Sequence, residues 1–168
     1  GFLKQQLQVR ESTAEAWQTM IEGQRGFFKP RYFVPYDTTP NHLSYYTTDK
    51  LRETLERYCD LKLVNDVNRM KVSVSAVNVR NGNFAIFSNE NEELHYDHFI
   101  ASGALPPGFP AVEIDGEYYW DGGLVSNTPL NEILSHEEHL KQLIFQVDLW
   151  NAKGPLPENM LEVGRPIN

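Results

Sequence analysis

The chain has 168 residues, a length typical of one domain. Hydrophobic residues make up 40% of it and charged residues 23%, which excludes a disordered or fibrous protein. The formal net charge is −8, and no Lys/Arg cluster supplies the basic face that duplex binding requires, so we expect no nucleic-acid partner.

Three features bear on the cellular compartment. No apolar run approaches the roughly 18 residues of a membrane-spanning helix, and residues 1–10 lack a signal peptide's apolar stretch. The single cysteine, Cys59, excludes internal disulfides and multi-cysteine zinc sites. These features predict a cytoplasmic protein. The first residue is Gly1 rather than Met, which we interpret as a cut from a longer chain; a leader lost with the preceding residues would change this localisation.

The N-terminal part is predicted to form two helices around an aromatic segment. Ser12 and Glu15 match a capping box that begins a helix, and Gly23 and Gly26 end it. Residues 27–46 hold three prolines and many aromatic side chains without a helical period. We expect this long irregular segment to fill the core, cover the sheet, line an acyl channel or touch lipid head groups. A second helix is predicted over about residues 48–60.

The next part is rich in β-strand and turn signals. A first hairpin is predicted from strands Met70–Val79 and Asn83–Ser88 around Asn81-Gly82, followed by a strand near Glu93–Tyr96. A short helix Asp97–Ser102, capped by Asp97, then leads into a loop over residues 103–110. A second hairpin is predicted from strands Ala111–Ile114 and Glu117–Trp120 around Asp115-Gly116. A helix beginning at Thr128-Pro129 and a short strand Leu143–Leu149 complete the order. The pattern predicts a mixed α and β fold.

Asp121, Gly122 and Gly123 form the segment with the clearest chemical potential. An aspartate at a strand end, followed by two glycines, lies in a turn with little side-chain cover. Two glycines allow positive φ and a close approach of another segment. Such a carboxylate is able to accept a hydrogen bond from an incoming hydroxyl or imidazole. The alternative interpretation is a tight turn capped by an Asp side chain.

An ordered series of motifs surrounds this segment. Its members are Asp97-His98-Phe99-Ile100-Ala101-Ser102-Gly103-Ala104-Leu105-Pro106, Phe109-Pro110-Ala111-Val112, Ile114-Asp115-Gly116-Glu117, Asp121-Gly122-Gly123 and Asn127-Thr128-Pro129-Leu130. In order and spacing the series resembles the C-terminal half of patatin-like phospholipases, a family of lipid acyl hydrolases. The resemblance covers residues 71–146. It implies an α/β fold, the C-terminal portion of a three-layer α/β/α sandwich that is incomplete without upstream strands.

The resemblance also implies a mechanism. The family uses a Ser–Asp dyad: a serine in a Gly-x-Ser-x-Gly elbow attacks the ester, and the Asp is its general base. Asp121 matches the dyad Asp, and Gly122 and Gly123 match its glycines. No cofactor or metal is implied, and the substrate is a lipid or another carboxylic ester.

The chain departs from the family pattern in two respects. It contains neither a Gly-x-Ser-x-Gly motif nor a glycine-rich oxyanion loop. Five serines in the predicted sheet region lack the flanking glycines of an elbow: Ser73, Ser75, Ser88, Ser102 and Ser126. We therefore expect this chain to be inactive alone. The missing N-terminal part, a homo-oligomer or a membrane surface is then the expected partner of its uncovered faces.

The domain organisation follows from the same reading. Residues 1–148 are predicted to form the C-terminal part of a hydrolase domain, with helices and the aromatic segment in 1–69 and the sheet in 70–148. Residues 149–168 are a proline-rich tail leading to an absent segment. The start of this tail resembles a bacterial subgroup of the family that carries a further C-terminal domain.

Other side chains offer weaker chemistry. His95 and His98 lie three residues apart, as zinc ligands do, but no third ligand stands at a defined spacing, so a corner leading into a helix is the simpler interpretation. His136 and His139 suit a helix C-terminus. Cys59 is expected to be buried, and Asp115 to serve a turn. A patatin-like binding or structural module without catalysis stays open as an alternative to the enzyme.

Overall fold

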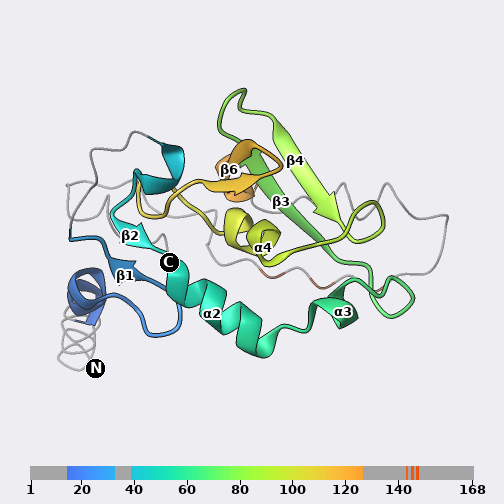
Figure 1. Cartoon of the computed structure of the whole chain (residues 1–168), viewed down its shortest axis with the longest axis horizontal. Coiled ribbons are helices and arrows are strands. Elements are labelled where there is room, and N and C mark those ends of the chain that lie inside the picture. Colours follow the sequence, from blue (N-terminus) through green and yellow to red (C-terminus); the bar gives the residue numbers. More distant parts are fainter. Residues whose placement is uncertain (1–14, 33–38, 127–142, 144, 146, 148–168) are drawn as a thin grey trace, which may run out of the picture. The chain divides into compact units, whose positions relative to one another are not determined.

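The computed structural model describes residues 15–32 and 39–126 together with residues 143, 145 and 147 (Figure 1). The chain divides into two units, Gly1–Asn127 and Thr128–Asn168, and the architecture below belongs to the first. Four predicted features lie outside the described residues: the helix start at Ser12, the helix from Thr128, the strand Leu143–Leu149 apart from three residues, and the tail 149–168. None of the described helices is long and apolar enough to cross a bilayer.

A helix over residues 15–22 comes first in the described chain and ends at Gly23, as predicted. Gly23 has φ +83°, and a Cβ there would lie 2.5 Å from the carbonyl oxygen of Phe28. Only glycine accommodates both the left-handed backbone and this close approach. The following segment then folds back on the end of this helix.

The predicted irregular segment contains short regular elements. Strand β1 (Lys29–Pro30) pairs antiparallel with β2 (Tyr46–Thr47), and a 3₁₀ turn, η1 (Pro40–His42), lies between them along the chain. The four aromatic rings of Phe27, Phe28, Tyr46 and Phe109 pack together, with centroid separations between 4.7 and 6.0 Å. The segment is therefore held by ring packing as much as by backbone pairing.

Helix α2 (Asp49–Tyr58) confirms the second predicted helix, and a short α3 (Leu61–Val64) follows it. Leu51 and Leu55, one turn apart, pack against the core. Tyr58 lies at the exposed end of α2, with the Arg57 guanidinium 5.2 Å from its ring centre. The amphipathic pattern thus identifies the packed side of α2 through its two leucines.

Two hairpins join into one four-stranded antiparallel sheet. Its strands are β3 (Ser73–Asn78), β4 (Phe84–Ser88), β5 (Val112–Ile114) and β6 (Glu117–Asp121), in the spatial order β4-β3-β6-β5. Both hairpins were predicted. The second has the expected two-residue turn, in which Asp115 and Gly116 both take positive φ (51° and 80°).

The turn of the first hairpin differs from the prediction. A two-residue Asn81-Gly82 turn was expected, but the strands are joined by residues 79–83. The Asn78 side chain accepts hydrogen bonds from the backbone N–H groups of Arg80 and Asn81. This side-chain cap turns the chain before Asn81 is reached, and Gly82 alone takes positive φ (71°).

The strand predicted near Glu93–Tyr96 is wrong. Residues 93–95 have no regular structure, and helix α4 (Tyr96–Ser102) begins at Tyr96. Leu94 is fully buried, and its N–H and carbonyl both bond to the Asn65 side chain, at 2.8 and 2.9 Å. A side chain from 29 residues away thus replaces the partner strand.

The N-cap of α4 was also predicted wrongly. His95, not Asp97, occupies the cap position, and its N–H donates to Nδ1 of His98 (2.8 Å). Asp97 lies in the first turn and forms an ion pair with Arg52 of α2. The carboxylate therefore joins two helices instead of capping one.

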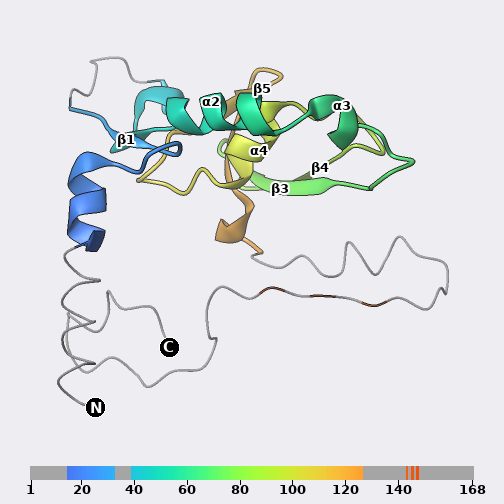
Figure 2. The ribbon, with the colours of Figure 1, turned by 90° about the horizontal axis from the view of Figure 1, so that it is seen from below.

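The core lies between the sheet and α4. Ala76, Phe87, Val112, Ile100 and Ala101 are at most 9% exposed and belong to one apolar cluster. Helix α4 contacts β3, β5 and β6, and α2 contacts α4. Figure 2 shows α4 between α2 and strands β3 and β4. The predicted mixed α/β fold is confirmed, and helices α4 and α2 lie over one face of this sheet (Figure 2).

Candidate active site

Asp121 is the last residue of β6, and its backbone is held from two directions. It pairs with Ala76 of the central strand β3. Its N–H donates to the carbonyl oxygen of Ala104 (3.1 Å), in the loop that follows α4. Ala76 and Ala104 are both at most 1% exposed. The Cα of Asp121 is thus fixed by a strand and by a buried loop at once.

The carboxylate of Asp121 is only partly used by these contacts. Oδ1 accepts a hydrogen bond from the N–H of Gly123 (2.8 Å) and so caps the 3₁₀ turn η2 (Gly122–Leu124). Within the described part of the chain no ion pair involves Asp121, and Oδ2 has no hydrogen-bond partner. The side chain is half-buried. One oxygen therefore orients the group and the other is open to a proton donor.

The two glycines were expected to allow positive φ and a close approach, and the close approach is confirmed for Gly122. Neither Gly122 nor Gly123 has positive φ. Gly122 is buried against β3, where a Cβ would lie 2.8 Å from the carbonyl carbon and oxygen of Ser75 and closer still to its Oγ. Gly122 thus lets the turn lie directly on the central strand.

The described serines do not form a nucleophile elbow. Ser73, Ser75 and Ser88 are strand residues, and Ser126 follows η2. Ser102 ends α4, and its hydroxyl donates to the carbonyl of Phe99 (3.0 Å). A nucleophilic serine needs a sharp turn from a strand into a helix, and no serine in residues 15–32 or 39–126 occupies one.

The contacts of His95 and His98 are those of structural residues. His98 is 3% exposed, and its Nδ1 accepts the His95 N–H, which leaves only Nε2 for any ligand. The ring packs against Phe87 at 4.6 Å, and Nε2 lies 3.7 Å from a Glu92 carboxylate oxygen. No group of three or more possible metal ligands occurs among the described residues. His136 and His139 lie outside them.

Two other residues take structural positions. Cys59 is half-buried at the C-cap of α2, where its carbonyl accepts the Tyr96 hydroxyl (3.3 Å). It was expected to be buried, and it is less so than predicted. Asp115 is confirmed as a turn residue of the β5–β6 hairpin. Neither residue is brought to Asp121 by a contact in the described region.

Two residues that hold the Asp121 turn were not expected to do so: Ala104 was assigned no role, and Ser75 was weighed only as a nucleophile. Ala104 supplies the carbonyl that fixes the Asp121 N–H, and Ser75 supplies the surface on which Gly122 lies. Both act through backbone placement, so their residue types carry no chemical signal. The pairing of β3 with β6 brings Ser75 to the site, and the loop after α4 brings Ala104.

Comparison with known proteins gives one match. The family model Patatin-like phospholipase matches residues 13–134, well over half of the chain, including the N-terminal helix and aromatic segment as well as the Asp121 turn. No curated protein and no solved structure matches the chain. The extent of the family match, with the mixed α/β architecture, shows that this chain belongs to the patatin-like phospholipase family.

Proposed function

We propose that Asp121 is the general base of a Ser–Asp dyad that hydrolyses lipid or other carboxylic esters. The observation that carries the proposal is that the two oxygens of the Asp121 carboxylate have different surroundings. Oδ1 is held by the N–H of Gly123, while Oδ2 has no hydrogen-bond partner among residues 15–32 and 39–126. The backbone is anchored to Ala104 and Ala76, so the group is positioned before a substrate arrives. Membership of a family of lipid acyl hydrolases supports the choice of reaction.

The proposed reaction has two halves. Oδ2 of Asp121 takes the proton of a serine hydroxyl as the serine oxygen attacks the ester carbonyl. The tetrahedral intermediate collapses, the C–O bond to the alcohol breaks, and the alcohol leaves with that proton. In the second half Asp121 takes a proton from water, and the resulting hydroxide adds to the acyl-serine. The bond between the acyl carbon and the serine oxygen then breaks, Asp121 returns its proton to that oxygen, and the carboxylic acid is released.

The nucleophile is proposed to come from outside this sequence. The 168 residues contain no Gly-x-Ser-x-Gly motif, and no described serine lies at an elbow. The serine and the oxyanion donors are then supplied by another part of the same protein or by a partner chain. On this proposal the chain supplies the base and is inactive alone.

Labelling with a fluorophosphonate probe tests this proposal, because the probe reacts only with an activated serine. We expect the full gene product to be labelled on a serine outside these residues and the 168-residue chain to stay unlabelled. Mass spectrometry of the labelled peptide identifies the serine. Labelling of a serine within the 168-residue chain would contradict the proposed origin of the nucleophile. A gene product that is never labelled would favour a patatin-like binding module without catalysis.

A further inference from the structure

The antiparallel pair β1–β2 has an inner and an outer face. Lys29 pairs with Thr47 and Pro30 with Tyr46, and the N–H of Arg31 bonds the Tyr45 carbonyl (2.8 Å), which extends the pairing by one residue. Paired residues share a face, and faces alternate along each strand. The Tyr46 ring packs against Phe28 and Phe109, so its face is the inner one.

The outer face therefore carries Lys29, Arg31 and Tyr45. The Tyr45 side chain is 66% exposed, and that of Lys29 is 53% exposed. Leu43, two residues before Tyr45, is 51% exposed. We call these four residues the ribbon surface. It combines two cations, Lys29 and Arg31, with two exposed side chains, the aromatic Tyr45 and the aliphatic Leu43.

The cations of the ribbon surface lie in a short acid-free stretch of an acidic chain. Residues 23–32 and 39–48 contain Arg25, Lys29 and Arg31 and no Asp or Glu, while Glu22, Asp37 and Asp49 border these ranges and the chain as a whole carries −8. The Nε of Arg31 is buried and has no hydrogen-bond partner among the described residues. Lys29 reaches one carboxylate, that of Asp49, at 3.7 Å, and both side chains are more than half exposed.

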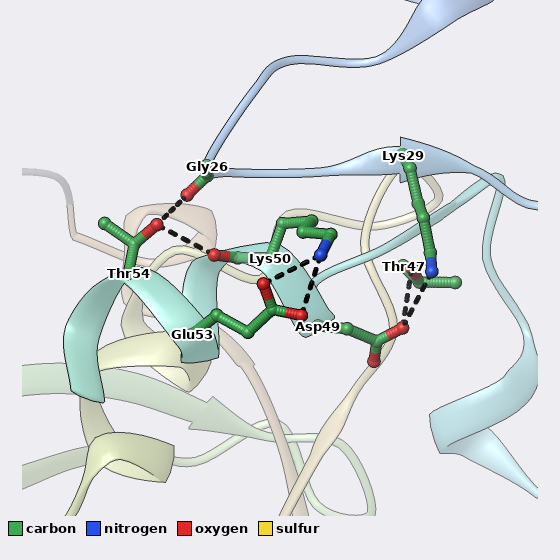
Figure 3. A network of polar contacts seen from close by, with 7 residues as sticks. All are labelled: Gly26, Lys29, Thr47, Asp49, Lys50, Glu53 and Thr54. Atoms are coloured by element: carbon green, nitrogen blue, oxygen red, sulfur yellow. Dashed lines mark hydrogen bonds and ion pairs between the residues drawn. The ribbon is translucent and has the colours of Figure 1, made fainter. Parts of the chain in front are cut away.

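The ribbon surface is firmly attached to the rest of the first unit. Figure 3 shows Lys29 and the Thr47 hydroxyl converging on Asp49 at the start of α2, and the Thr54 hydroxyl bonding the Gly26 carbonyl at 2.6 Å. On the other side, the N–H groups of Tyr45 and Tyr46 donate to carbonyls of the 103–110 loop, at 3.1 and 2.9 Å. The same loop holds Asp121 through Ala104.

We infer that the ribbon surface docks on an anionic phospholipid surface. Lys and Arg bind anionic head groups while Tyr and Leu enter the boundary between head groups and acyl chains. A second copy of this chain fits poorly, because Lys29 and Arg31 would face the same cations across a two-fold axis. This inference deepens the proposed function and rests on it for the choice of lipid. Its test measures binding, which needs no turnover.

The test is co-sedimentation of the 168-residue chain with vesicles of phosphatidylcholine, with and without phosphatidylglycerol. We expect binding to the mixed vesicles and much weaker binding to phosphatidylcholine alone. Lys29→Gln with Arg31→Gln should lower the association constant about 25-fold, from about 1 kcal/mol for each surface cation. Lys29→Gln alone, at an exposed site, should lower it about fivefold, and it serves if the double variant folds poorly.

The apolar part has its own variant and matched control. Leu43→Ser with Tyr45→Ser should lower the association constant roughly tenfold, since both side chains leave water on binding. Leu63 and Met70 are 50% and 59% exposed elsewhere in the unit, so Leu63→Ser with Met70→Ser removes a similar exposed apolar area. This control should leave vesicle binding unchanged. Lys62→Gln with Arg69→Gln removes two cations outside the ribbon surface and should also leave vesicle binding unchanged.

Three results would overturn the inference: no binding to the mixed vesicles, equal binding to both vesicle types, or equal losses in the control variants. Asp121→Asn should bind vesicles like the natural chain. If vesicle binding fails while the gene product is labelled by the fluorophosphonate probe, only the docking inference falls. If the chain binds vesicles but the probe does not label the gene product, the proposed Ser–Asp dyad is wrong and the docking inference stands.

Discussion

Strand β6 has an Asp-Gly pair at each end, and the glycines of the two pairs are required for different structural reasons. At the start, Asp115 and Gly116 both have positive φ, and a Cβ on Gly116 would meet nothing within 4 Å. At the end, Gly122 has no positive φ but lies against the backbone of Ser75. The same dipeptide thus supplies backbone freedom at one end and space at the other. Only the second end carries a carboxylate that its surroundings fix in place.

The largest stability effect is expected at the crowded end. Gly122→Ala should lower the free energy of unfolding by about 3 kcal/mol, because its Cβ overlaps the Ser75 backbone and β3 cannot move without disturbing the sheet. Urea denaturation of the 168-residue chain measures this loss. A loss below that of Gly116→Ala would show that the turn has room to shift, and would remove the structural reason for Gly122.

Gly116→Ala should have a smaller effect of a different origin. The site is open, so the loss is the left-handed backbone strain of an alanine at φ +80°, about 1–2 kcal/mol. Gly116→Asn separates strain from space, because asparagine tolerates this region better than alanine and is larger. We expect Asn to recover part of the loss in the same denaturation experiment. A greater loss for Asn than for Ala would contradict the conformational explanation.

Asp121→Ala should give the smallest stability change of the three. It removes the oxygen that accepts the Gly123 N–H and caps η2, which is worth about 1 kcal/mol. Asp121→Asn keeps an oxygen in that place, so its unfolding free energy should stay near that of the natural chain. The Asn variant therefore isolates the proton-accepting role from the structural one. A large destabilisation by Asn would mean that the charge itself supports the fold.

Much of the fold could be predicted from short-range patterns. The β5–β6 hairpin follows from Asp115-Gly116, and α2 follows from its helical spacing of Leu51 and Leu55. The errors arose where a distant or neighbouring side chain replaced a backbone partner. Asn65 satisfies the backbone of Leu94, so no strand forms there. The short-range pattern around Leu94 contains no trace of that contact.

The candidate site was predictable in part. Asp121 could be singled out as a candidate because Asp121-Gly122-Gly123 follows a predicted strand and, with its neighbouring motifs, resembles the patatin-like pattern. The geometry around it was not predictable. The close approach of Gly122 to Ser75 depends on β3 lying beside β6, and the hydrogen bond from Asp121 to Ala104 depends on the loop after α4 lying beside the end of β6. Strand order is a tertiary property, and the types of Ala104 and Ser75 give no sign of it.

The most direct test of the account compares the two aspartates of β6 as catalysts. The hydrolysis rate of a short-chain ester by the full gene product should fall at least about 100-fold in Asp121→Asn, the lower range for loss of a general base. Asp115→Asn, at the other end of the strand, should keep the natural rate. If Asp121→Asn keeps its rate, or if both variants lose activity equally, Asp121 is not the base.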